Sequence, residues 1–293
     1  MTDWDDFRYF LAVARNGSVT SASTVLGVNH STVSRRIAAM EKKHGVRLFE
    51  RLISGYEMTA AAENIYQLAL DIESKNHEMQ RLLFAQDSRL QGSINITIPH
   101  DLANYCVLPY FKAFTDQHPD ISINFIVSPS LKDLNAREAD IAVRLTPEPP
   151  ENLVGKKLAK LRHGIYQSKQ YQVKENKPVD LILWKHETTP PKWVKDHFPD
   201  HRVVLRVDDM ASKYAAVKAG YGLARIPCYL PDTLNEQNIR RLPLDMVPSD
   251  WGLWVLSHAD LRQTARIKAC KAFLHQILQE QTDLIEGKLS SYL

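Results

Sequence analysis

Six polar side chains with the chemistry to contact nucleic acid lie within seven consecutive residues near the N-terminus. They are His30, Ser31, Thr32, Ser34, Arg35 and Arg36. Arginine can donate two hydrogen bonds to guanine O6 and N7 or hold a phosphate, and short polar side chains at a helix start let the backbone approach base edges. The pattern therefore predicts a helix whose outer face meets the major groove of double-stranded DNA.

Two short helices joined by a turn are predicted to position this face. Ser18 has the side chain to cap the first helix, and Gly27 supplies the flexible residue at which that helix ends. Asn29 or Ser31 can cap the second helix. Each helix has apolar residues at the spacing of one buried face: Ala22, Val25 and Leu26 in the first, and Val33, Ile37 and Met40 in the second. A further amphipathic helix over residues 5–15 would complete a small core.

A short two-stranded wing is predicted after the second helix. Residues 44–59 contain a glycine break, an apolar strand with arginines, and a turn at residues 54–55. Arg51 would lie near the tip, where it can enter a minor groove or bind a phosphate, or else pair with Glu50 or Glu57. Two helices of an ordinary bundle with a solvated charged face are the alternative interpretation of the helical part.

The run from residue 10 to residue 59 resembles the winged helix-turn-helix of LysR-type transcriptional regulators, most clearly in the phrases SVTSASTVLGVNHSTVSRRIAAME and GVRLFER. The resemblance implies an N-terminal, all-α winged helix-turn-helix domain over residues 1–59 that binds double-stranded DNA. Two positions depart from the family pattern. Ser31 stands where the family often has proline, and Ala62 stands where it often has glycine. Neither change removes a charged contact, so they affect only the geometry of base reading.

Length and composition limit the class of protein. The 293 residues, 44% of them hydrophobic, are too many for a winged helix alone. The net charge is only +3, but residues 31–51 hold six Lys or Arg against two Glu, which favours phosphate contact at this surface. The acidic N-terminal segment does not resemble a secretion signal, and no apolar run reaches the ~20 residues of a membrane helix. A cytoplasmic protein without a membrane partner is therefore expected.

The sequence gives little support to an enzyme, a metal site or a disulfide framework. The three cysteines, Cys106, Cys228 and Cys270, are far apart and set in apolar sequence, so buried, inert thiols are expected rather than a zinc site or a redox sensor. No GxSxG motif or phosphate-cradling loop is present, and the histidine at 186 lacks the second histidine of a zinc-binding HExxH helix. We therefore expect a protein that is not an enzyme and holds no cofactor.

A long helix is predicted over the linker, residues 60–90, which has no Pro or Gly between Thr59 and Arg89. Its apolar residues follow a 3-4 heptad spacing that only Lys75 interrupts: Ile65, Leu68, Ile72, Met79 and Leu82. This spacing favours pairing with the same helix of a second chain, and the alternative is a helix that packs on its own chain's core. A dimer would place two recognition helices about one duplex turn, or a multiple of it, apart.

Residues 91–293 alternate predicted strands and helices, which indicates an α/β domain of two lobes. The first lobe, about 91–160 and 262–293, has predicted strands at 93–98, 121–127 and 140–144 and helices at 108–117 and 131–136. The second lobe, about 161–261, has predicted strands at 164–167, 181–184, 203–207, 223–226 and 253–256 and a helix at 210–219. An amphipathic helix over residues 267–278 is expected to pack back on the first lobe.

This half resembles the effector-binding domain of LysR-type regulators, which is similar to two-lobed periplasmic solute-binding proteins. The matching phrases are SINITIPHDLANYCVLPYFKAF, HPDISINFIV, ADIAVRL and AVKAGYGLARIP. The resemblance implies an α/β protein overall, an unknown small-molecule effector as ligand, a homodimer or homotetramer, and RNA polymerase as a further candidate partner. The alternative is a cytosolic small-solute-binding protein in which the N-terminal helices are structural.

Loops at the carboxyl ends of the predicted strands are the expected ligand site, because ligands of open α/β sheets collect there. Carried over from the family, the effector-binding residues are His100, Asp101, Ser128, Arg144, Thr146 and Asp208. Structural alternatives are helix capping for Asp101, Ser130 and Asp208, pairing with Glu138 for Arg144, and a plain surface position for His100. Arginine and helix N-termini favour a carboxylate-bearing effector, whereas the two aspartates oppose a highly charged anion. The identity of the effector stays open.

Overall fold

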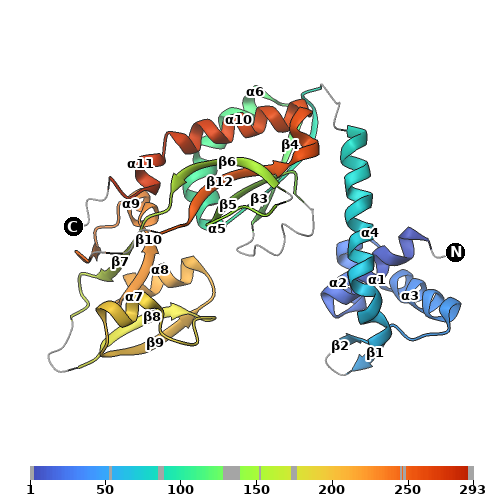
Figure 1. Cartoon of the computed structure of the whole chain (residues 1–293), viewed down its shortest axis with the longest axis horizontal. Coiled ribbons are helices and arrows are strands. Elements are labelled where there is room, and N and C mark those ends of the chain that lie inside the picture. The colour runs from blue at the N-terminus through green and yellow to red at the C-terminus, as the bar shows by residue number, and fades with distance from the viewer. Residues whose placement is uncertain are drawn as a thin grey trace. The chain divides into compact units, whose positions relative to one another are not determined.

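The computed structural model describes residues 3–52, 55–84, 89–127, 139–151, 153–172, 177–244, 246 and 249–289. The chain divides into two compact units, Met1–Leu83 and Phe84–Leu293 (Figure 1), and each is described by itself below. No helix within the described part of the chain has the length and hydropathy needed to cross a membrane.

The first unit begins with three helices: α1 (Trp4–Asn16), α2 (Val19–Leu26) and α3 (His30–His44). Asp3 caps α1 through a capping box, and Ser18 caps α2 by accepting a hydrogen bond from the Ser21 N–H at 3.4 Å. Gly27 ends α2 in the left-handed conformation, as predicted. Asn29 holds the cap position of α3, but its side chain makes no capping hydrogen bond.

The core of this unit contains most of the residues predicted for it. Ala22, Val33, Ile37 and Met40 are buried, together with Phe10 and Leu11 of α1. The prediction for Val25 was wrong, because its side chain is 69% exposed. The short helix α2 turns only Ala22 and Ser23 fully inward, and Val25 points away from α1 and α3.

The predicted wing is confirmed as an antiparallel pair, β1 (Phe49–Leu52) and β2 (Gly55–Met58). The Tyr56 N–H donates to the Gly17 carbonyl at 2.8 Å, which ties the wing to the α1–α2 turn. Gly55 has φ +134°, and a Cβ there would lie 2.5 Å from the Gly17 oxygen, so this contact requires glycine. At the base of the wing, Glu41 Oε1 accepts hydrogen bonds from the Leu48 and Phe49 N–H groups at 2.7 and 3.2 Å.

The predicted linker helix is α4 (Ala60–Phe84). One side of it packs on the core of the first unit through Ala62, Ile65, Tyr66, Ala69 and Leu70. Glu73 accepts two hydrogen bonds from the Arg15 guanidinium, at 2.5 and 3.1 Å, which fastens α4 to α1. Another side exposes the large apolar residues Leu68, Ile72 and Met79. The side chain of Leu82 and residues 85–88 lie outside the described part of the chain.

The first lobe of the second unit contains a five-stranded sheet in the order β4-β3-β5-β12-β6. Its strands are β3 (Gly92–Ile98), β4 (Ile121–Val127), β5 (Ile141–Thr146), β6 (Leu153–Lys160) and β12 (Gly252–His258). β3 runs parallel to β4 and β5, whereas β12 is antiparallel to β5 and β6. The predicted assignment of residues 253–256 to the second lobe was therefore wrong, because the chain returns to the first sheet at this strand. β6 was not predicted.

Helices cover this sheet as predicted (Figure 1). α6 (Leu108–Gln117) lies where it was predicted, and the C-terminal helix α10 (Ala265–Gln279) packs back on the first lobe against β3, β6 and β12. Phe111 and Phe114 of α6 contact Phe273 of α10, with ring centroids 5.7 and 5.5 Å apart. Residues 128–138, which include the predicted helix at 131–136, lie outside the described residues.

The second lobe has two small sheets. One has the order β10-β7-β11, from β7 (His163–Ser168), β10 (Ala224–Pro227) and β11 (Ile239–Arg241), and the other is the parallel pair β8 (Val179–Trp184) and β9 (His201–Val207). The described residues of this lobe form the helices α7 (Lys192–His197), α8 (Met210–Lys218) and α9 (Tyr229–Leu234). Four predicted strands and the helix at 210–219 are confirmed, and a bridge between Leu181 and Leu223 joins the two sheets.

Candidate nucleic-acid interface and effector site

Helix α3 presents the polar face that its sequence predicts. His30, Ser31, Ser34 and Arg35 are exposed, and Thr32 and Arg36 are partly exposed. Val33, Ile37 and Met40 point the other way, into the core. Because α3 begins directly after the short turn that follows α2, its N-terminal half projects polar side chains to solvent.

The two adjacent arginines of α3 differ in what they contact. The Arg36 guanidinium lies 3.2 Å from an Asp5 carboxylate oxygen and 3.4 Å from one of Asp6, and its central carbon is 5.6 Å from the Tyr9 ring centroid. Arg36 thus holds α3 on α1. Arg35 makes no hydrogen bond or ion pair with any residue that the structure describes, so its charge is available to a ligand.

Arg51 lies on β1 with an exposed side chain, opposite Tyr56 in the hairpin. Within the described residues it forms no ion pair with Glu50 or Glu57, the alternative that the sequence left open. Exposed basic side chains also follow along the last turn of α3 and the segment before the wing: Lys42, Lys43, His44 and Arg47.

Two of the predicted effector-binding residues lie in the short helix α5 (His100–Leu102). Asp101 is buried, and one of its carboxylate oxygens accepts a hydrogen bond from the Tyr229 hydroxyl of α9. This contact joins the first-lobe sequence to the segment that follows β10, and burial together with the Asp101 charge raises the pKa of Tyr229. His100 is exposed and contacts Asn104 through its Nε2 at 3.1 Å.

The predicted residues on β5 are buried in the sheet. Arg144 is 2% exposed, and its Nη2 donates to Thr97 Oγ1 on the neighbouring strand β3 at 2.5 Å. The Thr146 hydroxyl donates to the Glu148 carbonyl at 2.7 Å. Ser128 and the predicted alternatives Ser130 and Glu138 lie outside the described residues.

The alternative role of Asp208 as the cap of α8 was wrong by one residue. Asp208 is exposed, and it is Asp209 that caps the helix, accepting from the Ser212 N–H at 2.8 Å. The hydrogen bonds to Ser212 lower the pKa of Asp209, and the charge of His100 lowers it further.

Sequence reasoning missed a basic cluster in the second lobe, in which the buried Lys213 lies near the partly buried Arg225 and His163. Lys213 is 1% exposed, and its ammonium lies 4.1 Å from the centroid of the Trp184 ring. Arg225 Nη2 lies 3.3 Å from His163 Nδ1, while Arg225 Nε is buried without a hydrogen-bond partner in the described structure. Glu187 is the carboxylate whose charge reaches both Lys213 and Arg225.

Burial and like charge perturb this cluster strongly. Burial lowers the pKa of Lys213 to about 8, Glu187 opposes that shift and Arg225 adds to it. Burial, Arg225 and Lys213 lower the pKa of His163 to about 3, so this imidazole is neutral at pH 7. The cluster has two cations against one carboxylate in a place where charge is costly, which is an arrangement that attracts an anion.

The three cysteines are buried free thiols, as expected. Burial raises the pKa of Cys106 and of Cys270 to about 12, and it also raises that of Cys228. Among the described residues no group of His, Cys, Asp and Glu has the arrangement of a metal site.

Two family models match the chain, and together they cover most of it. The model described as "LysR substrate binding domain" matches residues 87–279, and the model described as "Bacterial regulatory helix-turn-helix protein, lysR family" matches residues 4–63. The chain belongs to the LysR family. The resemblance found in the sequence is thereby confirmed, and so is the fold class of an N-terminal helix-turn-helix with a C-terminal α/β domain.

The relatives found among known proteins match this chain over different lengths. A Mau operon transcriptional activator from Paracoccus denitrificans is 23% identical over 266 residues, 89% of this chain and 91% of that protein. An HTH-type transcriptional regulator from Xanthomonas campestris pv. campestris is 28% identical over 60% of this chain, and the match spans only 52% of that relative. The full-length structure of the Vibrio cholerae virulence activator AphB has a TM-score of 0.59 at 22% identity and covers 93% of this chain and 98% of its own, which shows a shared fold.

Proposed function

We propose that this LysR-family protein is a sequence-specific DNA-binding transcriptional regulator whose activity depends on a small-molecule effector bound by the second unit. The observation that carries the proposal is the division of α3 into a buried apolar face and an exposed face with Ser34 and Arg35. The segment is also the one that matches the regulatory helix-turn-helix family model. Side chains of these types near a helix start fit base edges in a major groove.

The contacts to DNA divide by position. His30, Ser31, Thr32, Ser34 and Arg35 contact bases and the adjoining backbone, and Arg51 binds a phosphate or enters the minor groove from the wing. Arg36 contacts DNA only by exchanging its carboxylate partners on α1 for phosphate. Its main role is therefore to fix the angle of α3 on the first unit.

Two copies of the chain pair through α4. Leu68, Ile72 and Met79 are 62%, 43% and 57% exposed, and they follow the heptad spacing of a helix that pairs with its own copy. The dimer presents two α3 helices to a two-fold symmetric DNA site, and a pair of dimers forms a tetramer. The regulator works on bacterial DNA in the cytoplasm and acts on transcription through RNA polymerase.

The effector carries an anionic group and binds in the second unit near Lys213 and Arg225. Two cations against one carboxylate, and a buried Arg225 Nε without a described partner, are the features that favour an anion. Of the residues predicted from the sequence, His100 and Asp208 have exposed side chains to offer, whereas Asp101, Arg144 and Thr146 shape the site through their internal hydrogen bonds. The effector changes DNA binding by preferring one arrangement of the two lobes.

Selection of bound genomic DNA tests the regulator function. The full-length protein is mixed with genomic fragments at two salt concentrations, and the retained fragments are sequenced. Enrichment of a two-fold symmetric motif by the wild type, and its loss in Arg35→Ala, is the expected result. Weak binding that vanishes at the higher salt without any enriched motif would contradict the proposal and would favour the solute-binding alternative.

A further inference from the structure

A pocket of about 270 Å³ lies on the first lobe, between the short helix η3 (Ala259–Gln263) and α10. Four of the side chains that line it are basic: Arg262, Lys268, Lys271 and His275. Among the described residues the rest of the lining is apolar, and none of its side chains is acidic. None of these residues is in the predicted effector set. The pocket is thus a concave, basic surface to which the regulator function assigns no role.

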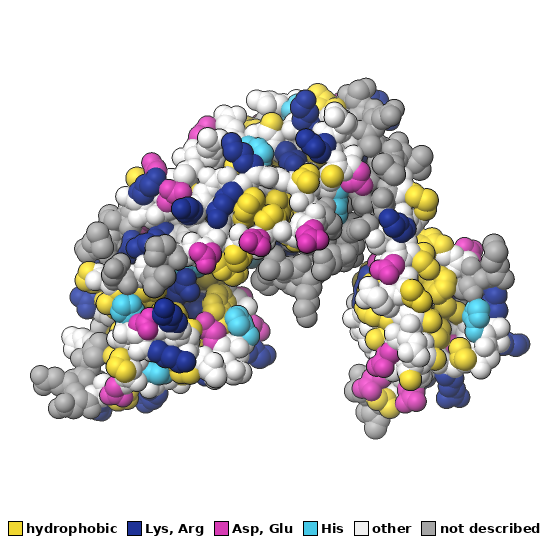
Figure 2. Space-filling view, in the orientation of Figure 1, with side chains coloured by type: hydrophobic (Ala, Val, Ile, Leu, Met, Phe, Trp, Pro, Cys, Tyr) yellow, Lys and Arg dark blue, Asp and Glu magenta, His cyan; other side chains and the backbone are white. Residues whose placement is uncertain are grey.

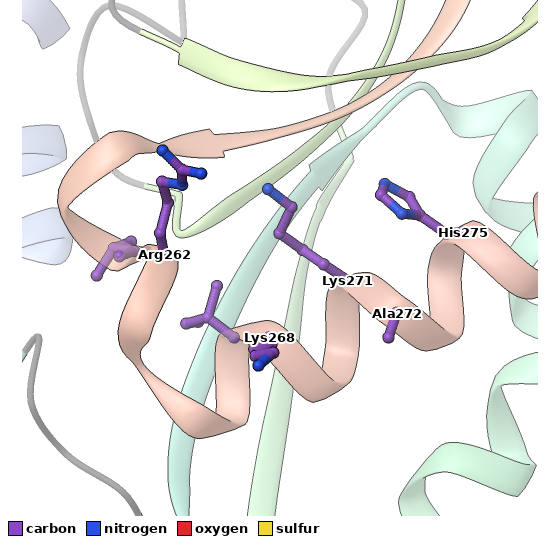
Figure 3. A pocket seen from close by; sticks show the side chains of 7 residues that line it. Arg262, Lys268, Lys271, Ala272 and His275 are labelled. Atoms are coloured by element: carbon purple, nitrogen blue, oxygen red, sulfur yellow. The ribbon is translucent and has the colours of Figure 1, made fainter.

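Three of the basic side chains share one direction. Figure 3 shows Arg262, Lys271 and His275 extending from η3 and α10 toward the same side of the pocket. Lys271 and His275 are four residues apart on α10, so they lie on the same face of that helix. Figure 2 shows Lys and Arg side chains and a His side chain close together over this part of the surface.

Lys271 is held in place rather than extended into solvent. Its ammonium donates to the Ser257 hydroxyl on β12 at 2.7 Å, and Ser257 itself is buried. Burial lowers the pKa of Lys271, and the charge of Arg262 lowers it further. The ammonium keeps two further N–H donors for a ligand.

His275 has an unused nitrogen. Its Nε2 is buried and has no hydrogen-bond partner in the described structure. Burial, Lys271 and Lys156 lower the pKa of His275, and a backbone hydrogen bond with Val255 opposes that shift. A buried nitrogen without a partner is costly unless a water or a ligand binds it. A bound anion favours the protonated imidazole, whose Nε2–H then donates to the anion beside the Lys271 ammonium.

We propose that this pocket binds a small phosphate-bearing anion, either inorganic phosphate or the phosphate group of a small metabolite. Arg262 binds two oxygens through its planar guanidinium, and Lys271 and His275 donate to the others. The three side chains that converge on the pocket offer more donors than the two oxygens of a single carboxylate would need, and the volume limits the ligand to a small molecule. The anion offsets the repulsion among these side chains and links η3, α10 and β12.

Calorimetric titration of the full-length protein with inorganic phosphate tests the proposal, with chloride keeping the ionic strength constant. The expected result is saturable binding of one phosphate per chain. Arg262→Gln and Lys271→Gln should each weaken binding about tenfold, because each removes a charge-assisted hydrogen bond. Lys195→Gln, which removes an exposed lysine of α7 in the second lobe, is the matched control and should bind as the wild type does.

Two outcomes would overturn the proposal: no saturable phosphate binding by the wild type, or equal affinity in the double variant R262Q/K271Q. Arg262 is exposed, so its substitution leaves the fold intact, and thermal unfolding without phosphate checks both variants. A parallel titration with glycerol phosphate distinguishes the sources, since tighter binding of the ester identifies a metabolite. The proposal stands apart from the regulator function, because selection of genomic DNA in phosphate-free buffer tests that function separately.

Discussion

Replacing Lys213 with methionine is expected to stabilise the second unit. Lys213 is 1% exposed, and within the described structure no carboxylate lies close enough to form an ion pair with it. Its ammonium contacts the Trp184 ring and feels the opposing charges of Glu187 and Arg225. Methionine keeps an unbranched side chain of similar length and removes the buried charge, which often stabilises a protein.

The lowered pKa of Lys213 determines the magnitude and the sign of the change in stability on Lys213→Met. Burial lowers it from 10.5 to about 8, and at about 1.4 kcal/mol per pH unit the charged form costs roughly 3 kcal/mol at neutral pH. Loss of the cation–π contact with Trp184 costs about 1 kcal/mol, so the free energy of unfolding rises by about 2 kcal/mol in the variant. Between pH 8 and 10.5 the folded wild type loses this proton before the unfolded chain does. The wild type therefore gains stability as pH rises through this range, and the advantage of the variant shrinks.

Thermal unfolding of the full-length protein at pH 7 and near pH 10 measures the effect. A gain of about 2 kcal/mol in a unit of this size corresponds to a rise of roughly 4–8 °C in Tm at pH 7. Lys195→Met, at an exposed position, should leave Tm unchanged. A Tm for Lys213→Met at or below that of the wild type at pH 7 would refute the reasoning, and so would an advantage of equal size at both pH values.

The first unit offers three further tests. Arg35→Ala should weaken specific DNA binding by about 1 to 3 kcal/mol without changing stability, whereas Arg36→Ala should lower Tm, as operator titrations and thermal unfolding would show. Leu68→Asp should convert dimers to monomers in light scattering, because it places a charge in the exposed apolar stripe of α4. Gly55→Ala should destabilise the wing by about 1 to 3 kcal/mol, measured by urea unfolding, since its Cβ would meet the Gly17 oxygen.

The helix-turn-helix was predictable because its signals are local. Ser18 caps α2, and Gly17, Gly27 and Gly45 end the three helices in the left-handed conformation. The spacing of Val33, Ile37 and Met40 identifies the buried face of α3 without reference to any other part of the chain. The one core residue wrongly predicted there belongs to a helix of only two turns, where helical spacing defines the inner face poorly.

The second unit was less predictable because its elements are defined by partners far away in sequence. Residues 253–256 form a good strand, but only the pairing of Val255 with Val143 and Lys156 shows which sheet it joins. β6 has the sequence LVGKKLAK, which by itself indicates a charged surface segment. Only its pairing with β12 shows that it is a strand of the first sheet. Strand propensity therefore located most strands but not their lobe.

The candidate effector site shows the same limit at the level of single side chains. Lysine is rarely buried, so nothing in the sequence of the helix at 210–218 singled out Lys213. Asp101 and Arg144 were predicted from their place near strand ends together with the family resemblance, yet their partners, Tyr229 and Thr97, are 128 and 47 residues away. Residue type and local position predict where a ligand site forms, whereas tertiary packing decides which groups are already engaged.

Arg35 and Arg36 show why a polar helix face does not by itself identify the residues that contact DNA. Consecutive residues of an α-helix are rotated by about 100° around its axis, so two identical side chains face different surroundings. Arg36 points toward the first turn of α1, where Asp5 and Asp6 also stabilise the helix N-terminus, and its charge is largely neutralised there. Arg35 has no such partner in the described structure. The acidic start of α1 thus assigns different roles to two residues that the sequence of α3 alone makes equivalent.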